Sequence, residues 1–232
     1  YSVEEVAAIQ TDDEFLQAAQ GFVIMTMTED VEAQIAEGKK YYETQAMYQL
    51  NTEFDPRQMV GDNYNDINER YYGNNHIDGP EAEHGTHVAG IVGAAWNGKG
   101  MDGVCEMAQL MIIRCVPNGD ERDKDVANAI RYAADNGARI INMSFSKSFS
   151  PGKAAVDEAA KYAESKGVLL IHAAGNDSKN IDVQPNFPKD TYNDGGVCGT
   201  WMEIGASGPT VEALCADFSN YGKKSVDVFA PG

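Results

Sequence analysis

Hydrophobic residues in the first fifty positions recur with the period of an α-helix. A capping residue followed three positions later by glutamate, which is typical of a helix start, occurs at Ser2 and again at Thr11. A further start near Thr26 is followed by apolar residues at spacings of three and four. The pattern predicts a hairpin of helices over residues 2–20 and 26–50, which we expect to pack on the rest of the chain by its apolar stripe.

Further along the chain, short apolar runs alternate with amphipathic helical stretches. The runs predict strands at residues 109–114, 139–143, 168–173, 201–206 and 226–229. One helix between them has Asp125 as its expected cap and ends at Gly137, and the next begins at Ser150 and ends at Gly167. Strand, helix, strand in this order predicts a parallel sheet with right-handed crossovers. The unbroken run at 168–171 is typical of a strand that is buried on both faces.

The stretch Glu83–Gly90 joins two histidines to a run of small residues. Glycine destabilises a helix interior by about 1 kcal/mol relative to alanine. A helix that carries Gly90 and Gly93 and no charge is therefore predicted to be buried, with close neighbours. Its first turn would hold His84 rigidly at the edge of a core, which suits a general base. The alternative is that His84 and His87 only pack.

Four motifs then follow one another in a characteristic order. They are Glu83–Gly90, Ile140–Phe145, Leu169–Ser178 and the pair Phe218–Gly222 and Val226–Gly232. Together they resemble the subtilisin-like serine peptidases (the subtilase family, peptidase S8), from Glu83 to Gly232. The resemblance implies an α/β fold with a parallel twisted sheet flanked by helices on both faces. Residues 1–70 would be an N-terminal helical insertion with an acidic loop, and residues 71–232 the central part of the peptidase domain.

The resemblance also assigns roles to individual residues. His84 would act as general base and acid, and Asn176 would donate its amide N–H to the oxyanion. The substrate-binding positions would be Ser144, Phe145, Ser146, Ala174 and Gly175. The first three would pair with the substrate backbone as an added strand, and the last two would form a wall of the specificity pocket. The family usually has glycine in place of Ser146. Without the resemblance, Asn176 would be interpreted as a turn residue, and we expect His87 and His172 to be structural.

Two parts of the family machinery are absent from this sequence. The catalytic aspartate normally ends an apolar strand before Ser/Thr-Gly, and no aspartate upstream of His84 has that setting. The nucleophile normally lies in Gly-Thr-Ser-Met-Ala after Ala-Pro-Gly, and this chain ends at Ala230–Gly232. We therefore expect an incomplete, inactive fragment of a serine endopeptidase, which its own missing segments or a swapped copy would complete. The alternative is a non-catalytic peptide-binding module on the same scaffold.

The charge of the chain narrows the choice of partners. Its formal net charge is −18, which argues against nucleic acid and anionic membranes because both need a basic surface. Residues 1–70 hold 15 acidic and 4 basic residues, so the acidic excess lies mainly in the predicted helical insertion. We expect a peptide or protein substrate as partner. No signal peptide is recognisable, and the family resemblance alone implies an extracellular or periplasmic location.

Neither the cysteines nor the acidic loops identify a cofactor. Four cysteines occur without a Cys-x-x-Cys pair, which argues against zinc. We expect Cys115 to be a buried free thiol and leave open a bridge between Cys198 and Cys215. The stretch 62–66 suggests calcium, but the EF-hand pattern needs an oxygen ligand where this chain has Tyr64. Calcium is implied only by the family, with no site assigned.

Overall fold

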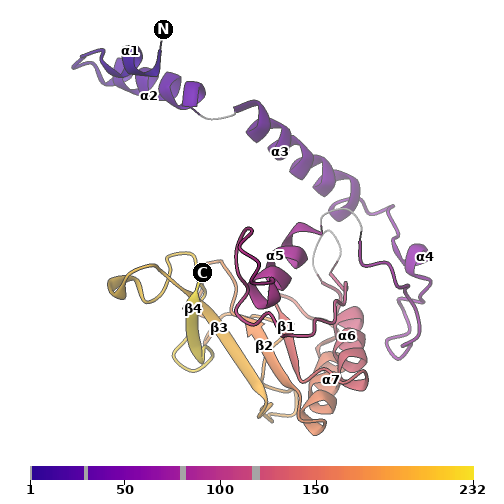
Figure 1. Cartoon of the computed structure of the whole chain (residues 1–232). Coiled ribbons are helices and arrows are strands. Elements are labelled where there is room, and N and C mark those ends of the chain that lie inside the picture. The colour runs from indigo at the N-terminus through magenta and orange to yellow at the C-terminus, as the bar shows by residue number, and fades with distance from the viewer. Residues whose placement is uncertain (1, 29–30, 79–81, 117–120) are drawn as a thin grey trace. The chain divides into compact units, whose positions relative to one another are not determined.

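The computed structural model describes residues 2–28, 31–78, 82–116 and 121–232. The chain divides into two units, Tyr1–Asp55 and Pro56–Gly232 (Figure 1). The loop that follows residue 55 therefore belongs with the second unit, whereas the predicted boundary lay after residue 70. The contacts responsible for this difference are described below.

The first unit is helical, as predicted. Its elements are α1 (Val3–Ala7), α2 (Glu14–Thr28), α3 (Val31–Thr44) and a π-helical turn η1 (Gln45–Gln49). The capping box at Ser2 is confirmed, because Glu5 N donates to Ser2 Oγ at 3.2 Å and Ser2 N donates to Glu5 Oε2 at 2.8 Å. The second cap differs from the prediction. Asp13 rather than Thr11 caps α2, because its Oδ1 accepts the N–H groups of Phe15 and Leu16 in the first turn at 2.9 and 3.2 Å.

The predicted helix start near Thr26 is wrong, because α2 continues to Thr28. Glu29, which completed the predicted start signal, lies outside the described residues. The apolar stripe that follows is exposed, with Ile35 at 66% and Leu50 at 75% of their full accessible area. Its packing on the rest of the chain stays a prediction. Within the described ranges, the helices are too short or too polar to cross a membrane.

The second unit contains the predicted parallel sheet. Its elements are α4 (Arg57–Val60), α5 (Glu83–Gly93), α6 (Asp123–Asp135), β1 (Ile140–Met143), α7 (Lys153–Ser165), β2 (Leu169–Ala173), β3 (Trp201–Ser207), the 3₁₀ turn η2 (Val211–Ala213) and β4 (Val228–Pro231). The strands lie in the order β1-β2-β3-β4 and every neighbouring pair is parallel (Figure 1). Met143 pairs with His172, and Ala173 pairs with Ile204. The carboxyl ends of the strands therefore meet at one edge of the sheet.

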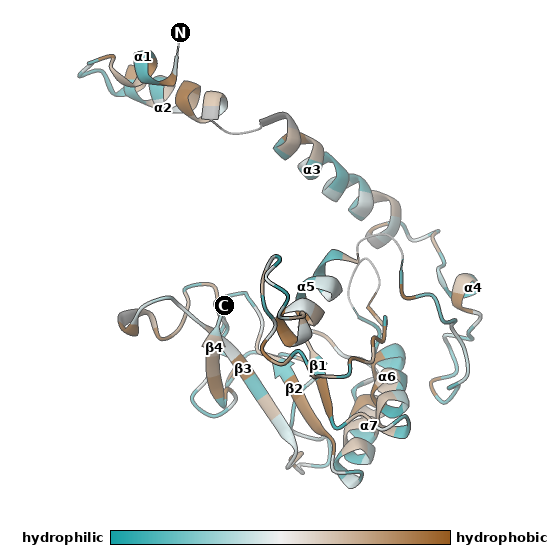
Figure 2. Cartoon of the chain, in the orientation of Figure 1, coloured by the Kyte–Doolittle hydropathy of each residue, from teal (hydrophilic) through white to brown (hydrophobic). Residues whose placement is uncertain are grey.

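The core forms where α6 and α7 pack on the first strands of the sheet. The apolar face of α6 is buried, with Val126 at 3% and Ile130 at 2% exposure. It packs with the small side chains of α7, such as Ala159, and with Leu170 of β2. Figure 2 shows hydrophobic residues along β1 and β2. One face of β2 is buried and the other is half-buried, whereas the apolar run predicted a strand buried on both faces.

The prediction of a buried α5 is also wrong. None of its described side chains is buried, and Ile91 is 42% exposed. The helix is hydrogen-bonded to the loop that follows it, since Val104 N donates to Ile91 O and Cys105 N donates to Val92 O, both at 2.9 Å. A Cβ atom added to Gly103 in that loop would lie 2.2 Å from Ala94 N, whereas one added to Gly90 would meet nothing within 4 Å. The close approach thus occurs at the end of the helix and requires glycine in the loop.

The segment 109–114 is not a strand. Its apolar side chains Leu110 and Ile112 are each 46% exposed, and the structure shows no ladder to it from any described strand. Ile140 in β1, the edge strand, is likewise 59% exposed. Apolar sequence alone does not make a strand, because the backbone N–H and C=O groups need a pairing partner.

A buried cluster of charges ties residues 56–72 to α6. Arg57 binds Asp62 at 2.6 Å and Asp125 at 2.8 Å. Lys124, which is 1% exposed, donates to Asp62 at 3.0 Å and to Glu69 at 2.8 Å. These contacts explain the position of the boundary between the two units. They also show that Asp125 does not cap α6, which begins at Asp123.

The charge cluster links stability to pH through Asp62. Burial alone would raise the pKa of Asp62, but hydrogen bonds from Arg57 and Lys124 outweigh it and lower that pKa. The unfolded value is about 3.9. Asp62 therefore contributes stability that is present above that value and is lost as the pH falls through the lowered folded pKa.

All four cysteines are free, so the bridge between Cys198 and Cys215 is not formed. Cys198 is buried and Cys215 is exposed. Cys115 is a free thiol as predicted, but it is half-buried rather than buried. Burial and the nearby charge of Asp125 raise its pKa to about 12.

We predict that Lys124→Met destabilises the chain by about 3–5 kcal/mol, because it leaves Asp62 and Glu69 without their buried cation. Lys161→Met is the matched control, since Lys161 pairs with Glu158 and Asp194 at the surface. Its expected cost is below about 1 kcal/mol. Urea unfolding of both variants measures the difference. Equal losses for the two lysines would contradict the role of the cluster.

We also predict two classes of thiol. At pH 8, a disulfide reagent such as dithionitrobenzoate should react quickly with exposed Cys105 and Cys215 in the folded chain. Cys115 and Cys198 should react only after unfolding, because burial limits the access of the reagent. For Cys115, the raised pKa also holds the thiolate fraction at about 10⁻⁴. Four reactive thiols in denaturant without reductant are expected. A count of two would show that a bridge exists after all.

Candidate active site

His84 lies beside the segment that follows β1. It stands in the first turn of α5 with an exposed side chain, and its Nε2 lies 3.1 Å from the backbone oxygen of Ser144. A carbonyl oxygen can only accept, so Nε2 carries the hydrogen in this contact. The loop contacts at the end of α5 hold the helix, and the helix in turn holds the imidazole at the carboxyl edge of the sheet.

The segment Ser144–Ser146 continues from β1 along that edge. Within the described part of the chain, the backbone groups of Phe145 and Ser146 make no hydrogen bond. Pairing resumes at Lys147, whose N and O bind the backbone of Phe187 at 3.0 and 2.9 Å. An extended segment with unpaired backbone groups is a surface on which a peptide can add as a strand.

The ring of Phe145 does not line this edge. It is half-buried, packs against the hydrophobic core and meets the His172 ring edge-on at 6.3 Å between centroids. Any contribution of Phe145 to binding would therefore come from its backbone.

The segment after β2 runs next to the segment after β1. Gly175 has a φ of +98°, and a Cβ added there would lie 2.8 Å from Ser146 Oγ and 2.5 Å from Asn220 Nδ2. Only glycine fits this position without strain. Ala174 beside it is fully buried. The two predicted substrate-binding segments are thus in contact through Ser146 and Gly175.

Asn176 follows Gly175 and is exposed. The structure gives its side-chain amide no hydrogen-bond partner among the described residues. The amide is therefore available to a bound molecule. His84 and Asn176 are linked through the Ser144–Ser146 and Ala174–Gly175 segments, and their catalytic roles stay predictions.

Sequence reasoning missed two asparagines that support this edge. Asn220, which is fully buried, donates from Nδ2 to Ala174 O at 2.7 Å. Asn186, which is 8% exposed, donates to the same oxygen at 3.1 Å. The motif Phe218–Gly222 marked the place of Asn220, but nothing in the sequence said which residues it contacts.

A buried histidine–glutamate pair lies inside the sheet next to the site. His172 is fully buried, and its Nδ1 lies 2.9 Å from both carboxylate oxygens of Glu203, the residue opposite it in β3. Trp201 Nε1 donates to Glu203 at 2.9 Å. The expectation that His172 is packed and hydrogen-bonded is confirmed. We did not predict a role for Glu203, although a glutamate within an apolar strand indicates that it has a buried partner.

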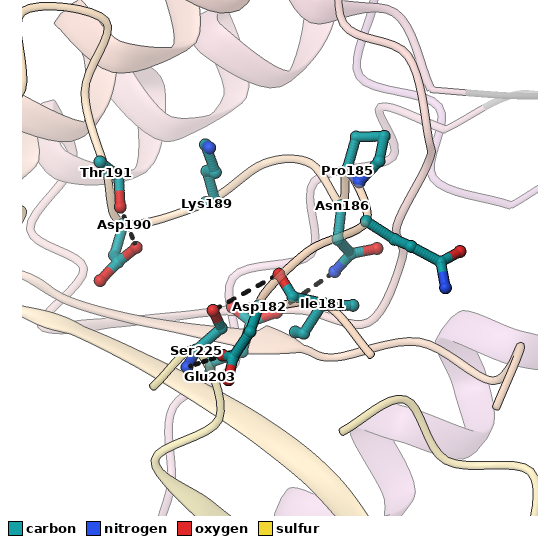
Figure 3. Close-up of a pocket in the computed structure, with 10 residues that line it drawn as sticks. Ile181, Asp182, Pro185, Asn186, Lys189, Asp190, Thr191, Glu203 and Ser225 are labelled. Atoms are coloured by element: carbon teal, nitrogen blue, oxygen red, sulfur yellow. Dashed lines mark hydrogen bonds between the residues drawn. The ribbon is translucent and has the colours of Figure 1, made fainter. Parts of the chain in front are cut away.

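A cavity of about 200 Å³ lies beside Asn186, which is one of its lining residues (Figure 3). Its lining residues are Ile181, Asp182, Gln184, Pro185, Asn186, Lys189, Asp190, Thr191, Glu203 and Ser225. Asp182 accepts backbone N–H groups from Lys224 at 3.0 Å and Ser225 at 2.9 Å, so it is already engaged. None of the predicted site residues lines this cavity, and we assign it no role in catalysis.

The acidic loop before α5 does not fit a metal ion. The oxygens of Asp62 and Glu69 and the backbone oxygen of Asn63 all surround the Lys124 ammonium, at 2.8–3.0 Å. A cation brought by the protein itself occupies the place that calcium would need. Elsewhere in the described ranges, histidine, cysteine and carboxylate side chains form no group of three that could hold a metal.

Comparison with known proteins gives consistent similarities. A sequence profile described as Subtilase family matches residues 26–232. The chain is 36% identical over 151 residues to thermitase from Thermoactinomyces vulgaris, covering 64% of this chain and 49% of thermitase. It is 35% identical over 169 residues to the cell wall-associated protease of Bacillus subtilis (strain 168), covering 72% of this chain and 17% of that protein. The solved structure of S41 psychrophilic protease matches with a TM-score of 0.53 and 32% identity, over 64% of this chain and 52% of that one. The chain thus spans about half or less of these relatives.

We predict that Gly175→Ala destabilises the chain by more than the backbone conformation alone explains. Gly195→Ala is the matched control, because Gly195 has a similar φ of +85° but nothing within 4 Å of an added Cβ. The control should cost about 1–2 kcal/mol. The extra loss at Gly175 reports the contacts with Ser146 and Asn220. Thermal unfolding of both variants measures it, and equal losses would mean that the two segments are not in contact.

Proposed function

This chain belongs to the subtilase family and has its subtilisin-like α/β fold, and we propose that it is the central part of a serine endopeptidase. The observation that carries the proposal is the 3.1 Å contact between His84 Nε2 and Ser144 O. It sets the histidine that matches the family's general base beside the segment that matches its substrate-binding strand. The relatives named thermitase and cell wall-associated protease support the same class of reaction.

In the proposed reaction, His84 takes the proton of a serine that this sequence does not contain. The serine oxygen bonds to the substrate carbonyl carbon, and the resulting oxyanion receives the N–H of Asn176. His84 then gives its proton to the leaving amine as the peptide C–N bond breaks. Water repeats the sequence and releases the acyl group. The unpaired backbone of Phe145 and Ser146 would hold the substrate as an added strand.

We propose that the 232-residue chain alone is inactive. It contains neither the family's serine motif nor its aspartate motif. In the observed contact, His84 donates from Nε2 to Ser144 O, so this nitrogen cannot at the same time accept a proton. An aspartate hydrogen-bonded to Nδ1 would favour the opposite tautomer. The missing segments or a swapped copy would supply both groups.

A non-catalytic peptide-binding module is the second candidate. The same unpaired backbone at Phe145 and Ser146 favours it, because strand addition needs no nucleophile. The two candidates differ in whether any protein that contains this chain reacts with a serine-directed probe.

We further propose an extracellular or periplasmic location and a peptide or protein substrate. The name of the cell wall-associated relative supports the location. The charge of −18 favours neither nucleic acid nor an anionic membrane as partner. We propose no cofactor, and the Lys124 ammonium argues against calcium in the loop at 62–69.

We predict that a fluorophosphonate probe does not label the purified 232-residue chain. A longer protein that contains the family's aspartate and serine segments should be labelled at one serine. His84→Ala in that protein should abolish labelling, since in the relative subtilisin loss of the histidine costs about 2 × 10⁶ in turnover. Labelling is measured by mass spectrometry.

His87→Ala serves as the control, because His87 also lies on α5 and is exposed, although it was predicted to be structural. It should leave labelling unchanged. Stoichiometric labelling of one serine in the 232-residue chain, lost on His84→Ala, would contradict the proposed inactivity. Failure of the longer protein to react would favour the peptide-binding module.

A further inference from the structure

The position of Asn176 must be set by its backbone. Its exposed side chain makes no hydrogen bond to another described residue, so no neighbouring group holds the amide. An oxyanion donor acts only if it is aimed before the reaction, because reorganisation during the step would cost the stabilisation that it provides. The question is which residue fixes the two peptide groups on either side of Asn176.

Both of these peptide groups bind Asn220. The carbonyl oxygen of Gly175, before Asn176, accepts from Asn220 N at 2.8 Å. The N–H of Asp177, after Asn176, donates to Asn220 Oδ1 at 3.0 Å. The same oxygen accepts from Lys179 N at 2.9 Å, and Asn220 Nδ2 donates to Ala174 O at 2.7 Å.

Asn220 is built into the fold so that its amide cannot turn away. Its side chain is fully buried, and its backbone lies directly after Ser219, which is 2% exposed. Backbone hydrogen bonds anchor this turn to the end of β3, since Ala216 N donates to Ala206 O and Ser219 N donates to Ala216 O, both at 2.9 Å. Gly175 lies so close to Asn220 Nδ2 that a Cβ would approach to 2.5 Å. The backbone of the loop that carries Asn176 is therefore hydrogen-bonded to the side-chain amide of Asn220. The turn that carries Asn220 is in turn held by the sheet.

We infer that Asn220 is a positioning residue for the oxyanion donor Asn176, which rests on the proposed peptidase function. It touches neither the substrate nor the reacting atoms. The carboxamide and the backbone N–H of Asn220 hold the two peptide groups next to Asn176. They thereby fix the direction in which the Asn176 side chain points. Asn186 is different, because it reaches only Ala174 O and Glu203 and neither peptide group next to Asn176.

The test is a double-mutant cycle in the longer, active peptidase, with active sites counted by the fluorophosphonate probe. Asn176→Ala should lower kcat by about 10²–10³, the loss measured for the corresponding donor in the relative subtilisin. Asn220→Ala should lower kcat by about 10²-fold through misplacement of the donor, with KM nearly unchanged. In the Asn176→Ala background, Asn220→Ala should cost little more, because the group that it positions is gone.

Ser219→Ala is the matched control, since Ser219 is equally buried but contacts no residue between Ala174 and Lys179 through its side chain. It should leave kcat nearly unchanged. If Asn220→Ala does not fold, Asn220→Leu, which is of similar size and has no hydrogen-bonding groups in its side chain, takes its place under the same criterion. Losses that multiply in the double variant, or a rise in KM alone, would overturn the inference. No loss from Asn176→Ala itself would instead overturn the proposed role of Asn176 as oxyanion donor.

Discussion

The site depends on the parallel pairing of β1 with β2. Met143 stands opposite His172, so both strands end at the same edge of the sheet. The residues that leave these strands must then run side by side, and Ser146 meets Gly175 there. A shift of this register by one residue would turn the buried side chains to the opposite face. Without this pairing, Ser144 would not be held where its carbonyl oxygen contacts His84.

Polar side chains, rather than hydrophobic packing, fix the far side of that edge. Asn220 and Asn186 both donate to the buried carbonyl of Ala174. Asparagine suits this task because one planar group carries an acceptor and two donors. A buried carbonyl left without a partner would cost about 1–3 kcal/mol. The wall of the edge is therefore specified by hydrogen bonds, which have a direction.

The same principle governs the buried charges. Lys124 lies among oxygens of residues 62–69, and His172 lies against Glu203 within the sheet. The Lys124 ammonium has carboxylate partners and the Glu203 carboxylate accepts hydrogen bonds, so the desolvation of both groups is offset. The Lys124 cluster joins an otherwise irregular loop to α6 and gives the loop an internal cation. A chain with net charge −18 thus uses one of its twelve lysines to neutralise a cluster of its own carboxylates.

The sequence by itself determined the α/β class, the parallel sheet, the amphipathic faces of α6 and α7 and the residues that match the family's site. These follow from local periodicity and from motifs whose members are neighbours in the chain. It did not determine that α5 is exposed, that 109–114 lacks a strand partner, or that Asp125 binds Arg57 instead of capping a helix. Nor could it show that Asn220 holds the peptide groups around Asn176. Only the tertiary structure decides such contacts, because burial, strand pairing and the partner of a polar group depend on which distant segments meet in space.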